Sequence, residues 1–343
     1  MSAHDCGLTN GHLSGLCHQG MDSSAYPRVC CTYQAHCGYS TSKQVSYFRS
    51  PAWPQLINNH SDCKLEVDLN PGVCQVRLDF VDFHLDGMKD GVCSVYNQMT
   101  INSTIKHAYL PTTTLCGDLS PPTIDPLDNL RTDIPHLYLH IEDAPVDKSG
   151  PKVMMPNAPS PSITLSVKVS DYPSKWNIRV TQIQCDGAPL QAPSGCSQYY
   201  NSQAGTITSL NYYDNQYMAN LDMTACVRLD QSACAIAYNI DSMSVGTTRG
   251  NKLGYGLTCA DYISFMGEKT GMCGTAVDRE VVLPLRGSQG VSMHSDSIFS
   301  KSEAGYKIQY RFVTIVYYGF IMFYSRYIRN CDGLKYYKYP HIK

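Results

Sequence analysis

Cysteine is the residue type with the most evident chemistry in this 343-residue chain, which contains 16 of them. Thiols pair as disulfides in an oxidising compartment, whereas a reducing compartment keeps them free unless they bind metal or perform redox catalysis. No Cys-x-x-Cys motif and no zinc-finger pairing of Cys with His occurs in the sequence. The cysteines therefore predict disulfides and an extracellular protein.

Metal binding by thiols has one candidate location, the N-terminal extension, residues 1–36. The available ligands are Cys6, Cys17, Cys30, Cys31, His12, His18 and His36. Their spacing matches no tetrahedral zinc motif. Disulfides within the extension are the favoured interpretation.

Catalysis needs a nucleophile beside a base, and no motif that supplies this pair is present. The sequence contains no Gly-x-Ser-x-Gly elbow, His-Glu-x-x-His helix, phosphate-binding loop or Gly-Asp-Ser-Gly-Gly segment. His84 is out of phase with Phe83 and Leu85, so we expect it on a solvated face. No catalytic residue is assigned, and the chain is predicted not to be an enzyme.

Charge excludes one class of partner. Lys and Arg together number 27, Asp and Glu 29, and the formal net charge is -2. A chain without a cationic excess has little to neutralise a phosphate backbone, so no nucleic-acid partner is expected.

Tyrosine is the abundant aromatic residue, with 25 Tyr against 8 Phe. Exposed Tyr clusters form good binding surfaces for proteins and glycans. The candidates for such a patch are Tyr199, Tyr200, Tyr212 and Tyr213. Packing on half-buried sandwich faces is the competing interpretation, and the one we favour slightly.

Two glycosylation sequons, at Asn59 and Asn102, agree with secretion. Residues 1–20 lack the apolar run of a secretory signal. We expect that a signal peptide is encoded by a first exon missing from this sequence.

An internal repeat organises the middle of the chain. Apolar residues follow Cys74 at offsets of two, four, six, nine and eleven, and the same offsets recur after Cys234. Period-two alternation indicates a strand with one buried face, and the three-residue step indicates a bulge or strand break.

Further motifs surround the two repeats. They are YFRSPAWP (47–54), Cys93, Cys116-Gly117, Ser295-Asp296 and Gly305-Tyr306. With the repeat, they resemble the CUB domain, a β-sandwich module of extracellular proteins, and the combination is most similar to uncharacterised arthropod secreted proteins with tandem CUB domains. The resemblance implies an all-β fold of two tandem, disulfide-bonded, jelly-roll-like CUB sandwiches. The many short alternating segments and the lack of a long amphipathic helix agree with it.

The expected organisation has five parts. They are an N-terminal extension (1–36), a first CUB-like domain (37–185), a linker (186–195), a second CUB-like domain (196–312) and an atypical tail (313–343). The tail is rich in Tyr, Ile and Lys, and its uncharged stretch is shorter than the roughly 20 residues of a membrane-spanning helix. We interpret it as a translated intron or frame error, so that no membrane span is expected and Cys331 is no true partner for Cys234.

The resemblance also implies a disulfide framework. Its pairs are Cys37 with Cys63, Cys93 with Cys116, Cys196 with Cys226, and Cys259 with Cys273. Cys185 lies nine residues after Trp176, at the end of the last expected strand of the first domain. We hypothesise that it pairs with Cys74 and clamps the sandwich.

Some CUB domains bind calcium through three carboxylates, and each domain here keeps two at matching positions. The first has Asp86 and Asp171, with Tyr96 in place of the third. The second has Asp261 and Asp296, with Gly246 at the position of the third. Solvated loop acids are the favoured interpretation; weak calcium binding is the alternative, and no other cofactor is expected.

These observations predict a non-enzymatic extracellular recognition protein that binds a protein or glycan through its CUB loops or one sheet face. A structural component of extracellular matrix or cuticle is one alternative. The non-catalytic regulatory part of a larger secreted protease is another. Fold alone does not decide among them.

Overall fold

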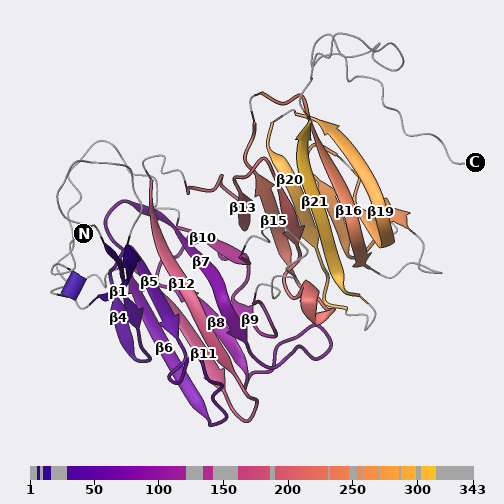
Figure 1. The fold of residues 1–343 in the computed structure, drawn as a ribbon. Helices are drawn as coiled ribbons and strands as arrows, with labels where there is room; N and C mark the ends of the chain where they lie inside the picture. Colours follow the sequence, from indigo (N-terminus) through magenta and orange to yellow (C-terminus); the bar gives the residue numbers. More distant parts are fainter. Residues whose placement is uncertain are drawn as a thin grey trace, which may run out of the picture. The chain divides into compact units, whose positions relative to one another are not determined.

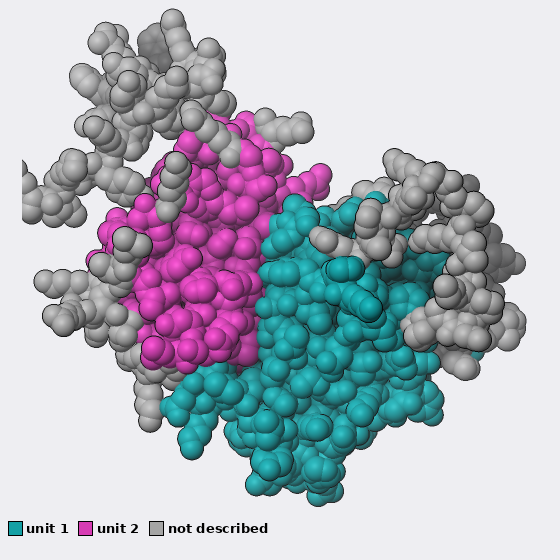
Figure 2. Space-filling model, turned by 180° about the vertical axis from the view of Figure 1, so that it is seen from behind, with its two compact units in different colours: residues 1–125, 134–198 teal, residues 126–133, 199–343 magenta. Residues whose placement is uncertain are grey.

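The structure is a computed structural model, and its described residues fall into two compact units. The described ranges are 6–7, 11–16, 29–120, 134–141, 161–185, 190–230, 232–246, 253–256, 259–268, 270–285, 287–298 and 303–313. Described residues up to Gln198 form unit 1, and those from Tyr199 onward form unit 2 (Figure 2). The expected tail lies almost wholly outside the described residues, as do Cys17 and Cys331.

Unit 1 contains two five-stranded sheets (Figure 1). Their strands are β3 (Gln34–Ala35), β4 (Tyr39–Thr41), β5 (Val45–Arg49), β6 (Ser61–Asp68), β7 (Val73–His84), β8 (Gln98–Ser103), β9 (Thr114–Leu115), β10 (His136–His140), β11 (Ser162–Val169) and β12 (Lys175–Gln184). One sheet has the order β10-β7-β12-β5-β3 and the other β4-β6-β11-β8-β9. A separate two-stranded sheet joins β1 (His12–Leu16) to β2 (Val29–Thr32).

The core of unit 1 lies on the alternating apolar positions of these strands. Phe48 on β5 packs against Trp176 on β12, with ring centroids 5.9 Å apart, and both side chains are fully buried. Phe80 and Phe83 on β7 contact each other edge to face at 5.4 Å. Such aromatic pairs add to the free energy gained by burying their area.

Unit 2 forms one continuous set of strands (Figure 1). They are β13 (Gln198–Tyr200), β14 (Ala204–Thr208), β15 (Asp222–Val227), β16 (Ala235–Val245), β17 (Gly254–Tyr255), β18 (Tyr262–Phe265), β19 (Met272–Pro284), β20 (Gln289–His294) and β21 (Gly305–Val313), with the 3-10 helix η1 (Tyr212–Asp214). The order is β13-β15-β20-β18-β19-β16-β21-β14, and β17 also pairs with β19. The long β19 therefore passes between two sheets, pairing with β17 and β18 near its start and with β16 along its length.

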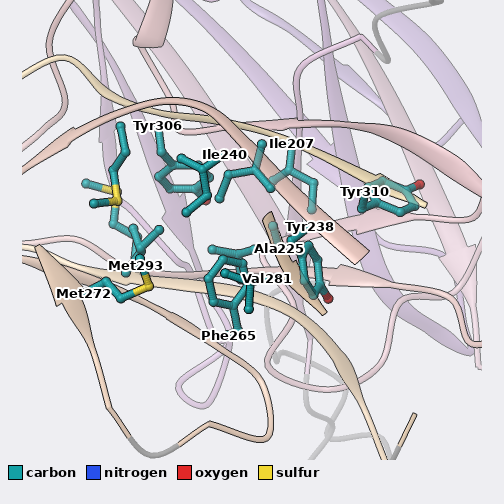
Figure 3. Close-up of a cluster of buried hydrophobic side chains, with 14 of the residues drawn as sticks. Ile207, Ala225, Tyr238, Ile240, Phe265, Met272, Val281, Met293, Tyr306 and Tyr310 are labelled. Atoms are coloured by element: carbon teal, nitrogen blue, oxygen red, sulfur yellow. The ribbon is translucent and has the colours of Figure 1, made fainter. Parts of the chain in front are cut away.

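Buried apolar side chains from these strands pack together inside unit 2 (Figure 3). Tyr238 on β16 and Phe265 on β18 lie with ring centroids 4.8 Å apart, so the cluster joins strands from both halves of the strand order. The prediction of an all-β, disulfide-bonded fold is confirmed, and the described residues include no long helix.

The internal repeat corresponds to β7 and β16, and the predicted change of phase is a bulge in both. The pairing of β12 with β7 steps from Asp82 to Phe80, which leaves Val81 without a partner. The pairing of β21 with β16 steps from Ser242 to Ile240 and skips Asp241. Both skipped residues lie seven positions after the repeat's cysteine.

Disulfides join the strands and loops as the sequence predicts wherever the pairs are described. The bonds Cys37–Cys63, Cys74–Cys185, Cys93–Cys116 and Cys259–Cys273 are present, together with Cys6–Cys31 in the extension. Cys196 and Cys226 are each disulfide-bonded, and their mutual pairing stays a prediction. Cys234, for which the sequence predicted no partner, is also disulfide-bonded.

Candidate functional site

Three polar side chains are buried together at one end of unit 2. Tyr217, Asp261 and Glu303 are 1%, 3% and 3% exposed, and the Tyr217 hydroxyl contacts both carboxylates. Buried carboxylates are costly unless they are hydrogen-bonded or paired, so such a cluster calls for an explanation. We refer to these three residues as the hub.

Loops from several strands bring the hub together. Tyr217 lies just before β15, Asp261 just before β18 and Glu303 just before β21, while Gly246 follows β16 and Asp296 follows β20. Because antiparallel neighbours run in opposite directions, a strand that ends and a neighbour that begins meet at the same edge. We call these loops the loop end of unit 2.

The Tyr217 hydroxyl is the centre of the hub's hydrogen bonds. It lies 2.6 Å from Oδ2 of Asp261 and within hydrogen-bonding distance of Oε2 of Glu303, and it accepts from the Gly246 amide at 3.1 Å. Burial, together with these two carboxylates, raises the pKa of Tyr217, so the phenol keeps its proton at any physiological pH.

Counting protons gives the chemistry of the hub. A phenol has one proton to donate, so it satisfies only one of the two carboxylates as a donor. Asp261 has a second donor, because its Oδ1 accepts from the Asp296 amide at 2.7 Å. These contacts are of the kind that brace loops.

Gly246 occupies the position where the resemblance expects a calcium-binding acid, and the local backbone explains the glycine. Its φ is +65°, and a Cβ atom there would lie 2.5 Å from the Asp261 carbonyl oxygen. Any other residue would be strained and would push this loop away from Asp261. The loop therefore approaches the hub with its backbone rather than with a side chain.

The Ser295-Asp296 pair forms hydrogen bonds with the segment 218–221 and with Asp261 of the hub. The Ser295 hydroxyl donates to the Met218 carbonyl at 2.8 Å and accepts from the Leu221 amide at 2.9 Å. The Asp296 amide donates to Oδ1 of Asp261 at 2.7 Å. The motif thus fixes the segment that follows Tyr217 relative to the hub.

The structure brings the two acids predicted for the second domain together and adds a third. The contact between Asp296 and Asp261 is made by the Asp296 backbone amide, whereas Oδ1 of Asp296 accepts from the Ile298 amide at 2.6 Å. Glu303 reaches the same hydroxyl as Asp261. Carboxylate oxygens are the donors that calcium prefers, so the donor chemistry fits. Among the described residues, however, no three acidic, His or Cys groups converge as a ready metal site, and calcium binding stays a prediction.

Unit 1 has no counterpart to the hub in its described part. Asp86 and Asp171 make no hydrogen bond or ion pair with each other, and Tyr96 is exposed. The nearest polar pair is His84 with Asp118, whose Nδ1 and Oδ2 atoms lie 3.3 Å apart at a partly exposed position. The expected solvated position of His84 agrees with this geometry.

The four candidate tyrosines do not form one patch. Tyr200 is 4% exposed and packs edge to face against Tyr310 at 6.2 Å, so it belongs to the core and cannot bind a partner. Its carbonyl accepts from the Arg228 amide at the C-terminal end of β15. Tyr212 and Tyr213 lie on η1, ahead of the N-terminal end of β15.

This placement corrects the predicted patch. Tyr199 and Tyr200 lie at the opposite end of unit 2 from Tyr212 and Tyr213, because β15 separates the two pairs along its length. Sequence proximity suggested one surface, whereas the intervening β14 carries the chain from one end to the other. Of the four, Tyr213 is the exposed one, at 40%, and it lies beside the loop end.

Both predicted glycosylation asparagines are accessible. Asn59 is exposed in the loop before β6, and Asn102 is exposed on β8. Among the described residues, no helix is long and apolar enough to cross a membrane.

Comparison with known proteins identifies both units. The CUB domain matches residues 37–132, and the animal CUB domain matches residues 193–313. The chain therefore belongs to the CUB-domain proteins and contains two CUB domains in tandem. CUB domains are typically extracellular protein-interaction modules, and the disulfides fit that setting.

Individual relatives are remote. No curated protein matches the chain. Solved structures that are similar include the CUB1-EGF-CUB2 domains of rat MASP-1, at 13% identity and a TM-score of 0.28, covering 82% of this chain and 99% of that chain. The human MASP-1/3 CUB1-EGF-CUB2 domain has the same identity and TM-score, with 79% and 100% covered. The extracellular region of zebrafish Gpr126/Adgrg6 has 9% identity and a TM-score of 0.28, with 82% and 37% covered. The expected similarity to arthropod proteins stays a prediction.

Proposed function

We propose that this chain is a secreted, non-enzymatic recognition protein whose loop end of unit 2 binds an extracellular protein or glycan. The observation that supports this most is the buried hub, which ties loops from five places in the sequence into one rigid end. Rigid loops lose little conformational entropy on binding, so they are suited to recognition.

The accessible side chains of the loop end have the character of a binding surface. Tyr213 and Ile298 are 40% and 76% exposed, and the Asn220 backbone between them is held by the Asp296 carbonyl at 2.8 Å. An exposed aromatic and an exposed aliphatic residue on a fixed backbone supply apolar contact area, and the surrounding Asn and Asp residues supply a polar rim.

We also propose that the loop end binds calcium weakly. Asp261, Asp296 and Glu303 would supply carboxylate oxygens, the donors that calcium prefers. In that role the ion would brace the loops rather than take part in a reaction.

Saturable binding to purified extracellular proteins and a glycan array tests the proposed recognition. The double variant Tyr213→Ser/Ile298→Ser should lose most of the affinity for any ligand found. Leu229→Ser is the matched control, because Leu229 is a comparably exposed apolar residue beside Arg228 at the opposite end. Equal affinity of the wild type and the loop-end variant would overturn the assignment.

A further inference from the structure

A second surface, on unit 1, has features of a binding site that the loop end does not explain. It lies on the outer face of the sheet formed by β10, β7, β12, β5 and β3 (Figure 1). On β5 the side chains alternate, with Phe48 in the core and Tyr47 and Arg49 half-buried on the other face.

The Arg49 guanidinium lies over two aromatic rings. Its guanidinium carbon lies 4.4 Å from the centroid of Trp53 and 5.4 Å from that of Tyr47. Its Nε donates to Oδ1 of Asn177 at 3.2 Å. A guanidinium stacked on rings and tied at one nitrogen has lost most of its freedom before any ligand arrives.

The Trp53 ring is itself fixed. Its Nε1 donates to Oδ2 of Asp82 at 3.1 Å, and the same oxygen pairs with Lys175 Nζ at 3.0 Å. Asp82 is therefore already neutralised by Lys175. Trp53 is thus held by a carboxylate whose charge is already neutralised by Lys175.

Arg49 itself has no carboxylate partner in the described part of the chain. Its only polar contact there is the neutral Asn177 amide, so its two terminal amino groups have no acceptor. Partial burial lowers the pKa of Arg49, and only the neighbouring Tyr47 opposes this effect. The cation is thus partly desolvated without compensation, which a bound anion would supply.

A second arginine repeats this condition on the next strand. Arg179 on β12 lies directly opposite Tyr47 in the sheet, and its Nε is buried without a hydrogen-bond partner. Its other neighbour across the sheet, Asp79, is engaged by Arg77 at 2.7 Å. Arg49 and Arg179 therefore flank Tyr47, and neither forms an ion pair with a carboxylate in the part of the chain that the structure describes.

We infer that Tyr47, Arg49, Trp53 and Arg179 form a binding site for an acidic side chain, Asp or Glu, of a partner protein. A carboxylate is planar and matches the edge of a guanidinium that lies over aromatic rings. Trp, Tyr and Arg are also the residues most enriched at the centres of protein interfaces. The site is on unit 1 and does not depend on the loop end of unit 2.

The test uses the intact, oxidised chain and a defined probe, the blocked peptide acetyl-tetraglutamate amide, with acetyl-tetraglutamine amide as the uncharged comparison. Binding is followed by the shifts of the Arg Nε–H resonances in nitrogen-15 NMR spectra. The Arg49 and Arg179 signals should shift saturably with tetraglutamate and not with tetraglutamine. Arg49→Gln and Arg179→Gln should each weaken binding about tenfold, the range expected for one charged hydrogen bond.

Arg311→Gln is the matched control, because Arg311 is an exposed arginine of unit 2 that already pairs with Glu280 at 2.8 Å. This variant and the loop-end variant Tyr213→Ser/Ile298→Ser should bind tetraglutamate normally. Equal weakening by Arg311→Gln would mean unspecific attraction and would overturn the site, as would no binding by the wild type. Sulfate that shifts the same two signals at lower concentration than tetraglutamate would overturn the carboxylate assignment.

Discussion

The hydroxyl of Tyr217 lies 2.6 Å from Oδ2 of Asp261, although 44 residues separate them in the chain. Both side chains are buried, and the same hydroxyl reaches the equally buried Glu303. One phenol therefore links the entry to β15 with the entries to β18 and β21. This single side chain therefore joins three of the segments that form the loop end.

Replacing Tyr217 by Phe removes the hydroxyl and keeps the ring. A buried carboxylate then loses a donated hydrogen bond and the Gly246 amide loses its acceptor, so the free energy of unfolding should fall by about 2–3 kcal/mol. Urea denaturation of the wild type and variant measures this. Tyr213→Phe, at an exposed position, should change the value by less than about 0.5 kcal/mol. Indistinguishable stabilities of Tyr217→Phe and wild type would contradict the structural role of the hub.

Gly246→Ala tests the close approach of a backbone to the hub. The new Cβ would sit at φ +65° and press on the Asp261 carbonyl. The combined strain and clash should cost about 3 kcal/mol, against about 1 kcal/mol for a positive φ alone. Gly38→Ala is the control, because Gly38 has φ +80° and open space around its Cβ position. Equal losses in the two variants would argue against the contact with Asp261.

Calcium should stabilise unit 2 if the loop end binds it as proposed. At a calcium concentration ten times the dissociation constant, linkage gives about 1.4 kcal/mol of added stability. Thermal melts with 10 mM calcium or 10 mM magnesium should show the rise for calcium alone. Asp296→Asn and Glu303→Gln should each reduce it. A melting temperature that does not change on addition of calcium would contradict the proposed calcium binding.

The Cys74–Cys185 bond should be the strongest single constraint on unit 1. It closes a loop with a sequence separation of 111, whereas Cys259–Cys273 in unit 2 spans 14. Loop-closure entropy predicts a loss of about 4–5 kcal/mol for Cys74→Ala/Cys185→Ala and about 3 kcal/mol for Cys259→Ala/Cys273→Ala. Denaturant titrations compare the two. A larger loss for the shorter loop would contradict the entropic account.

Sequence patterns predicted the parts of the fold that depend on periodicity. The apolar offsets after Cys74 and Cys234 predicted strands with a break, and the breaks are the bulges at Val81 and Asp241. Cysteine spacing likewise predicted the Cys74–Cys185 bond, because a strand start and a neighbouring strand end meet at one edge.

The hub and the arginine stack were missed, because each depends on single residues with no repeating pattern. Glu303 precedes the Gly305-Tyr306 motif by two residues, which was the one available signal. Tyr200 was misplaced for a related reason: exposure of a Tyr depends on which neighbour it packs against, here Tyr310, more than 100 residues away in the sequence. Trp53 lies in a motif that was interpreted through its resemblance alone.

Peptide mapping under non-reducing conditions tests most directly whether the chain works outside the cell as two oxidised CUB sandwiches. Protein purified from its native source, with free thiols blocked before digestion, should yield linked peptides for Cys37–Cys63, Cys74–Cys185, Cys93–Cys116 and Cys259–Cys273. Blocked, unpaired thiols at Cys74 and Cys185 would place the chain in a reducing compartment and contradict the account.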